Sequence, residues 1–197
     1  GKVDCDPYVF EKLISGPAKI SIHAEVIDNQ RFLVEPIRQG GTVYIFGAGH
    51  VSQRVALASE SVGFRTVVLD DRAEFANRER FPSADRIIVP ESFDDVVKSL
   101  PLDEESYVVI ATRDHAYDQN VLGQALKSAA GYIGMIGSKR KVATAFRALE
   151  GEGHTAEELA RVHAPIGISI DAETPAEIAI SIAGQLIQVR AAKERAV

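Results

Sequence analysis

The sequence of 197 residues has no tryptophan, one cysteine and no excess of basic residues. Its single cysteine, Cys5, cannot form an internal disulfide, so we expect a reducing, cytoplasmic setting. The net charge of −6 argues against a nucleic-acid-binding protein, which normally carries a basic excess. No run of about 18 apolar residues is present, so the sequence predicts no membrane-spanning helix and no membrane partner.

A signal-peptide pattern and a starting methionine are also missing, since the chain begins with Gly1 and its one methionine is Met135. The sequence thus leaves open whether an N-terminal portion precedes it. Apolar residues make up 46% and charged residues 25% of the chain, which is typical of a globular protein with a real core. This length fits one domain, alone or with a small appendage.

Residues 1–38 follow a different pattern from the rest of the chain. The stretch "DPYVFEKLI" has the apolar spacing of a helix, and "KISIHAEVI" and "RFLVEPI" alternate apolar and polar residues around a turn at Asp28-Asn29-Gln30. We expect a helix and a β-hairpin, which could be the remnant of a larger domain. Gln39-Gly40-Gly41 then interrupts the chain.

Residues 41–197 alternate strand and helix patterns. This order predicts an α/β fold, namely a Rossmann-like doubly wound parallel sheet with helices on both faces. Capping patterns at Ser92 with Asp95, at Thr155 with Glu158 and at Thr174-Pro175 mark helix starts. The expected strands are 42–47, 65–71, 85–90, 107–113 and 132–137, and the expected helices are 51–63, 92–100, 116–129, 138–153, 155–162 and a long one from 175.

A glycine turn joins the first of these strands to its helix. Its residues fit the Gly-x-Gly-x-x-small pattern, in which the first glycine permits a tight turn and the second lets the backbone approach a pyrophosphate. The helix start would offer free N–H groups and a positive dipole end. The alternative is a turn that only packs strand against helix. The candidate binding residues are Gly47, Ala48, Gly49, His50, Val51 and Ser52.

The end of the second strand carries Asp70, about 20 residues after the glycine turn, where an acidic group typically binds a ribose hydroxyl. Such a group favours an NAD-like ligand over an NADP-like one, although the nearby Arg72 weakens that distinction. His50 could face the ligand or lie in solvent at the first helical turn.

A second anion site is predicted where the fifth strand ends. Gly137 is followed by Ser138, a good N-cap, and by Lys139, Arg140 and Lys141 in the first helical turn. Cations there oppose the helix dipole, so a bound phosphate or other oxyanion would offset them. The alternative is a solvated basic surface.

Polar residues also follow the fourth strand and precede the last helix. Thr112, Arg113 and His115 could hold a polar ligand, or the loop could simply cap a helix through Asp114 or His115. With Asp118 these residues form no recognised zinc pattern, so we expect no metal site. His163 lies in a loop that could close over the ligand.

Four stretches together resemble the XdhC/CoxI family, the xanthine dehydrogenase accessory factors. They are "IFGAGHVSQ", "ATRDHAYDQNVL", "YIGMIGSKRK" and "HAPIGISIDAETPAEIAISI". The sequence departs from the family pattern at Ser169 and Asp171, where Asp and Gly are common, and at Arg113-Asp114, where relatives have His or Arg-Gly-His. Residues 1–38 also lack the Cys-Gly motif expected in the family's N-terminal domain.

The resemblance implies a Rossmann-like domain that binds the molybdenum cofactor, as molybdopterin or its nucleotide form. It implies a role in sulfurating that cofactor and delivering it to a molybdenum hydroxylase apo-enzyme, with a cysteine desulfurase as a further partner. We expect a homodimer, because the last helix is strongly apolar.

Two alternatives remain open. One is an NAD-dependent oxidoreductase for a small carbonyl or hydroxy compound, with His115 or Lys139 as acid or base. The other is a vestigial nucleotide site on a protein that docks partners through its last helix. No nucleophile–base pair is apparent in the sequence, so a cofactor chaperone is preferred to an enzyme.

Overall fold

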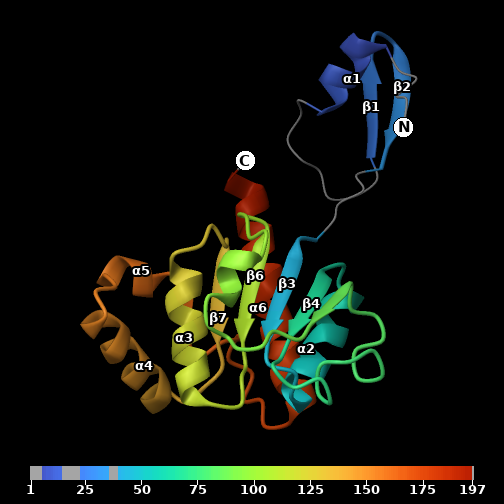
Figure 1. Cartoon of the computed structure of the whole chain (residues 1–197). Coiled ribbons are helices and arrows are strands. Elements are labelled where there is room, and N and C mark those ends of the chain that lie inside the picture. Colours follow the sequence, from blue (N-terminus) through green and yellow to red (C-terminus); the bar gives the residue numbers. More distant parts are fainter. Residues whose placement is uncertain (1–5, 15–22, 36–39, 197) are drawn as a thin grey trace. The chain divides into compact units, whose positions relative to one another are not determined.

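The computed structural model describes residues 6–14, 23–35 and 40–196. Contacts divide the chain into two compact units, Gly1–Arg38 with Arg190–Val197 and Gln39–Val189 (Figure 1). Cys5 and parts of the predicted hairpin strands lie outside the described residues.

The N-terminal unit contains a helix and a hairpin, as the sequence predicts. Helix α1 spans Pro7–Ile14, and strands β1 (His23–Ile27) and β2 (Gln30–Val34) pair antiparallel. Asp28 and Asn29 have φ values of 47° and 63° and form a two-residue turn, for which the twist of a hairpin favours positive φ. Gln30, predicted in the turn, is already the first residue of β2.

The larger unit is built on one parallel sheet of six strands in the order β5-β4-β3-β6-β7-β8. The chain starts in the middle with β3, adds β4 and β5 to one side, and then returns to add β6, β7 and β8 to the other. The fold class is therefore confirmed as Rossmann-like and doubly wound. The strand bounds are β3 Thr42–Phe46, β4 Arg65–Leu69, β5 Arg86–Ile88, β6 Ser106–Ile110, β7 Tyr132–Met135 and β8 Val162–His163.

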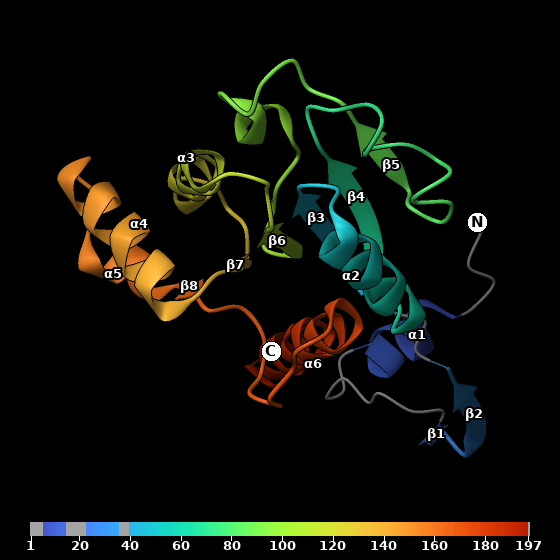
Figure 2. The ribbon, with the colours of Figure 1, turned by 90° about the horizontal axis from the view of Figure 1, so that it is seen from below.

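Helices cover both faces of this sheet (Figure 2). On one face Phe46 and Ile110 pack against α3 and α4, and on the other Ile45 packs against α2 and α6. Because the central strands are buried on both sides, they consist almost entirely of apolar residues. The helices are α2 His50–Ser61, α3 His115–Leu126, α4 Lys139–Gly151, α5 Ala156–Ala160 and α6 Pro175–Ala196.

Two elements differ from the sequence prediction. The helix expected at 92–100 is only a 3-10 turn, η1 (Val96–Ser99), because Asp95 has a φ of 51° and breaks the predicted capping box. The prediction that His163 lies in a loop is also wrong, since the short edge strand β8 contains it. The caps at Thr155 and Thr174 are confirmed by their hydrogen bonds to Glu158 and Glu177.

Candidate functional site

The glycine turn lies between β3 and α2, where the two halves of the sheet meet. Gly47 has a φ of 101°, and a Cβ added to it would lie 2.2 Å from the carbonyl oxygen of Ala111. The chain itself therefore requires glycine at this position, through backbone conformation and the close approach of the loop after β6. Ser52, the small third residue of the motif, is buried in α2.

Gly49 has a different reason to be glycine. It is the N-cap of α2 with φ −74° and ψ −175°, a conformation open to any residue. A Cβ added there would meet no atom within 4 Å. Within the described residues, neither strain nor packing explains a glycine at position 49. Open space above a helix N-terminus is what a phosphate group needs when it approaches the backbone closely.

Asp70, at the end of β4, supports this turn through a hydrogen bond. Its side chain is 2% exposed, and its Oδ2 atom accepts a hydrogen bond of 2.8 Å from the amide of Ala48. Its two oxygens also accept bonds from the Arg72 guanidinium, at 2.9 and 3.0 Å. Burial opposes ionisation, but these hydrogen bonds outweigh it and lower the pKa of Asp70. Because both oxygens are engaged, Asp70 braces the turn rather than presenting a free carboxylate to a ribose.

Two arginines complete the support of the turn. Arg72 stacks on Phe75, with its guanidinium carbon 3.9 Å from the ring centroid. Arg80 donates to the carbonyl oxygen of Ala48 at 3.2 Å and to the side chain of Gln53 at 3.1 Å. The peptide groups on both sides of Ala48 are therefore fixed by side chains. Arg72, predicted as a binding residue, lies near the turn and is paired with Asp70.

Asp71, the neighbour of Asp70, pairs with Arg113 from the loop after β6. The guanidinium donates two parallel hydrogen bonds of 2.5 and 2.9 Å to the carboxylate, and a third of 3.2 Å to the hydroxyl of Tyr117. Arg113 is 37% exposed and Asp71 16% exposed. The hydrogen bonds to Asp71 raise the pKa of Arg113 above its usual range.

The second predicted anion site lies at the start of α4. Ser138 is the N-cap, and its side chain accepts from the amide of Lys141. The Lys141 ammonium lies 2.6 Å from Oδ2 of Asp118, a carboxylate that is 1% exposed. The other oxygen of Asp118 accepts from the amide and hydroxyl of Thr112, at 3.0 and 2.6 Å. Lys141 is thus held by an internal partner, whereas Lys139 and Arg140 are exposed.

A cavity of about 480 Å³ opens between the N-termini of α3 and α4. His115 comes from the start of α3, after the N-cap Asp114, which confirms the helix-cap interpretation of this loop. Its lining also includes Met135, Ser138, Arg140 and Lys141, together with the Asp118 carboxylate that pairs with Lys141. Two helix N-termini and the exposed Arg140 border this hollow, which suits an oxyanion, while the charge of Lys141 is balanced by Asp118.

Most of the predicted site residues lie at the carboxyl edge of the sheet, whereas His50 and His163 have other surroundings. The turns after β3 and β7 lie on the same edge, because all six strands are parallel, and the loop after β6 with Thr112 and Arg113 lies between them. His50 lines a separate cavity of about 260 Å³ with Arg54 and Thr174. His163 stacks on Tyr132, with ring centroids 4.7 Å apart, and Tyr132 belongs to the core cluster packed against α6.

Two residues that carry contacts here are absent from the site predicted by the sequence: Asp71 and Arg80. The sequence groups Asp118 with the polar residues after the fourth strand, but it does not predict the pairing of Asp118 with Thr112 and Lys141. Arg80 lies 32 residues from the carbonyl it binds, in a segment without regular structure, so no spacing could have indicated it.

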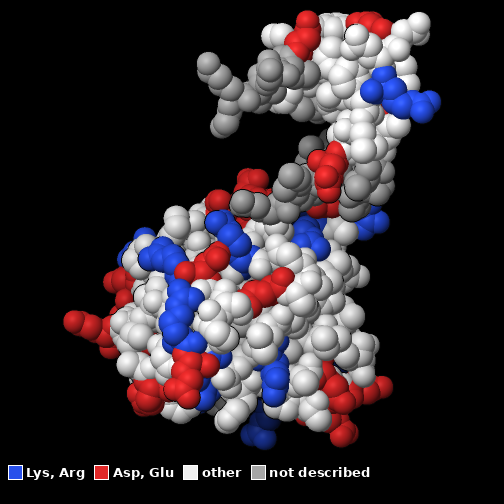
Figure 3. Space-filling view, turned by 90° about the vertical axis from the view of Figure 1, so that its right-hand side faces the viewer, with Lys and Arg blue, Asp and Glu red and all other residues white. Residues whose placement is uncertain are grey.

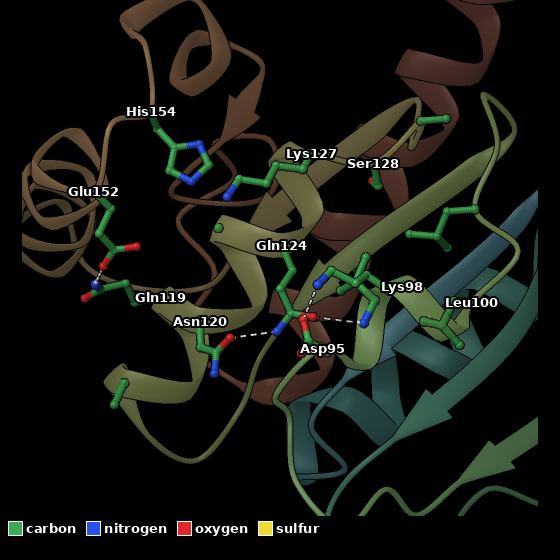
Figure 4. Close-up of a pocket in the computed structure, with 15 residues that line it drawn as sticks. Asp95, Lys98, Leu100, Gln119, Asn120, Gln124, Lys127, Ser128, Glu152 and His154 are labelled. Carbon is green, nitrogen blue, oxygen red and sulfur yellow. Dashed lines mark hydrogen bonds and ion pairs between the residues drawn. The ribbon is translucent and has the colours of Figure 1, made fainter.

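The largest cavity described, about 650 Å³, lies elsewhere, along the outer side of α3 (Figure 4). Gln119, Asn120 and Gln124 form its floor, and they are bonded to Glu152, Asp94 and the carbonyl of Phe93. Lys127 lies beside His154 in this cavity, and Lys98 lies in another part of it, near Asp95 (Figure 4). The sequence prediction included none of these side chains.

On the face drawn in Figure 3, Lys and Arg side chains lie among Asp and Glu side chains. Within residues 6–14, 23–35 and 40–196, no three His, Cys, Asp or Glu side chains gather as metal ligands. None of the helices in this part of the chain is long and apolar enough to cross a membrane.

Residues 43–186 match the family model of the XdhC Rossmann domain. Among curated proteins, the uncharacterized protein YqeB of Escherichia coli K12 is 36% identical over 146 residues, which are 74% of this chain and 27% of YqeB. A protein of Bacillus subtilis, described as a probable xanthine dehydrogenase subunit, is 29% identical over 159 residues, which are 80% of this chain and 45% of that protein. The chain therefore spans less than half the length of both relatives.

A solved structure, that of a xanthine dehydrogenase from Bacillus halodurans, superimposes with a TM-score of 0.68 at 33% sequence identity. The match covers 86% of this chain and 48% of that one. The structural likeness, like the family match, therefore covers most of this chain and not only the glycine turn.

Proposed function

Since this chain belongs to the XdhC family of Rossmann domains, we propose that it binds the molybdenum cofactor for a xanthine dehydrogenase-type molybdenum hydroxylase. In this role it would assist sulfuration of the cofactor and its insertion into the apo-enzyme. Two similar proteins carry xanthine dehydrogenase in their names, which supports this client class. A cysteine desulfurase partner, a homodimer and a cytoplasmic location stay predictions.

The observation that carries the proposal is the open space at Gly49. Nothing in the described chain requires glycine there, yet a side chain would stand where a phosphate meets the amides of α2. These residues fit an anionic group. The turn is fixed on both sides of Ala48 and lies at a helix N-terminus. The Asp70 carboxylate is neutralised by Arg72, so it would not repel the ligand.

Each site would hold a different part of the ligand. The amides after Gly49 would bind the phosphate or pyrophosphate, and the cavity between α3 and α4 would accept a second anionic group beside Ser138, Arg140 and His115. When bound, the cofactor would supply the molybdenum centre that is to be sulfurated. Asp118 would fix Lys141 beside this cavity, and the exposed Arg140 would supply the cation that meets the ligand.

The order of the six strands also favours a second candidate, an NAD-dependent oxidoreductase, because dinucleotides bind at this switch point in folds of the same order. His115 or Lys139 would then act as the acid or base. Equilibrium binding separates the two functions. Tight binding of molybdopterin with weak binding of NAD(H) and no turnover supports the accessory role, whereas hydride transfer to a small carbonyl compound supports the enzyme.

The direct test is mass spectrometry of small molecules that copurify with the protein, followed by binding to a Gly49→Asp variant. Aspartate is a good N-cap, so α2 keeps its stability, but its carboxylate would occupy the phosphate position. We expect the affinity for the pterin ligand to fall at least about tenfold. Gly151→Asp is the matched control, because Gly151 also faces open space but lies at the far end of α4. Unchanged binding in Gly49→Asp would refute the proposed site.

A further inference from the structure

The ion pair between Arg113 and Asp71 crosses the glycine turn. Asp71 follows β4 and Arg113 follows β6, and β3 lies between these two strands in the sheet (Figure 2). The two parallel hydrogen bonds of the pair therefore join the loops on either side of the strand that ends in Gly47. A ligand bound at the glycine turn along this edge of the sheet would lie next to the pair.

The pair also changes which acid can accept a ribose. Asp70 is buried and held by Ala48 and Arg72, so its carboxylate has no free oxygen for a ligand. Asp71 is the more exposed of the two acids, and Arg113 occupies both of its oxygens. A ribose whose two hydroxyls take the side of Asp71 that now faces Arg113 has to compete with Arg113 for this carboxylate.

We propose that the Arg113–Asp71 pair is a gate over the glycine turn, opened by a ligand that carries a diphosphate and a ribose with free hydroxyls. This inference rests on the proposed function and selects the nucleotide-linked form of the cofactor over bare molybdopterin. The diphosphate gives Arg113 a new bidentate partner, and the ribose hydroxyls give Asp71 new donors. A ligand with only one of these groups leaves Asp71 with only the more distant Arg72 guanidinium, 3.9 Å away, or Arg113 with only the Tyr117 hydroxyl.

Tyr117 keeps the arginine close to the turn while the gate is open. The guanidinium carbon of Arg113 lies 4.9 Å from the centroid of the Tyr117 ring, and its nitrogen bonds to the Tyr117 hydroxyl. Tyr117 is in the first turn of α3, so it contacts Arg113 from a different element than Asp71 does. Arg113 can therefore exchange a carboxylate for a phosphate without losing its contact with the ring.

The test is calorimetric titration of the whole chain with inorganic pyrophosphate and with ADP, for the wild type and Asp71→Asn. We expect the variant to bind pyrophosphate at least about threefold more tightly, because Arg113 no longer has a charged partner. We expect the preference for ADP over pyrophosphate to fall, because the carboxylate that accepts the ribose is gone. High salt should reduce the difference between the two proteins.

Asp114→Asn is the matched control. It removes the same charge next to Arg113 but keeps the N-cap of α3, since asparagine also caps helices well. An equal gain in pyrophosphate affinity in this control, or no gain in Asp71→Asn, would overturn the gate. If pyrophosphate binds to the wild type and is lost in Gly49→Asp while Asp71→Asn changes nothing, the glycine-turn site stands and the gate fails. If neither probe binds any of the proteins, both fail.

Discussion

Lys141 and Asp118 form an ion pair of 2.6 Å, in which the carboxylate is almost completely buried and also accepts two hydrogen bonds from Thr112. The pair joins α3 to α4 and links both to the loop after β6. One cation of the basic run at the start of α4 is therefore part of the fold, and the remaining two are exposed.

Replacing Lys141 by methionine should destabilise the protein. The substitution keeps the alkyl chain but leaves the Asp118 carboxylate buried without a cation, which we expect to lower the free energy of unfolding by about 1–3 kcal/mol. Urea unfolding measures the change. Lys139→Met is the control and should shift the free energy by less than about 0.5 kcal/mol, because Lys139 is exposed. Equal effects of the two substitutions would contradict this role of the pair.

Gly47 and Gly63 should respond differently to alanine although both have positive φ, 101° and 89°. At Gly63 a Cβ has no atom within 4 Å, so Gly63→Ala should cost only the left-handed strain, about 1 kcal/mol. Gly47→Ala adds the clash with the Ala111 carbonyl and should cost at least about 2 kcal/mol. Thermal unfolding of the two variants checks this order, and the reverse order would show that the loop after β6 yields easily.

Asp70 should make stability depend on pH in acid. Its pKa is lowered in the folded state, so the stability it contributes is present above its unfolded pKa of about 3.9 and is lost as pH falls through its folded pKa. At pH 7, Asp70→Asn should lower the free energy of unfolding by about 2–3 kcal/mol. We expect that difference to shrink below pH 4 in denaturant titrations. A difference that stays constant down to pH 2 would show that the charge of Asp70 is irrelevant.

His163 should act in the same direction at higher pH. Burial lowers its pKa, so the folded protein binds the proton less readily than the unfolded chain does. Stability is therefore complete above the unfolded pKa of about 6.5 and decreases as pH falls from there toward the folded pKa. In His163→Phe, which keeps an aromatic ring against Tyr132, this decrease should be smaller. Unfolding curves at pH 7.5 and 5.5 for both proteins make the comparison.

Much of the architecture follows from local patterns. The alternation of elements, the glycine stops and the caps at Thr155 and Thr174 depend on neighbours a few residues apart, and a sequence displays such relationships directly. Strand β8 escapes prediction because two residues carry no periodicity, and its pairing with β7 depends on the remote partners Ile133 and Gly134. The helix expected at 92–100 fails because Asp95 adopts a left-handed conformation that its spacing from Ser92 does not reveal.

The site can be predicted in outline but not in its connections. The glycine turn and the start of α4 follow from local motifs, whereas the partners of Arg113 and Ala48 lie 42 and 22 residues away along the chain. The departure at Asp171 has a clear structural meaning, since its φ of 53° is the conformation that glycine, common in the family at this position, adopts without strain. Which acid supports the turn and which is more exposed required the three-dimensional structure.

The fixation of Ala48 has a consequence for the proposed binding of an anion at this turn. Its N–H donates to Asp70 and its C=O accepts from Arg80. The turn would therefore need no rearrangement before the amides after Gly49 bind an anion. Little conformational entropy would then be lost on binding, and the shape of a preorganised site would determine selectivity. Removing the side chain of Asp70 or Arg80 would therefore weaken anion binding although neither side chain contacts the anion.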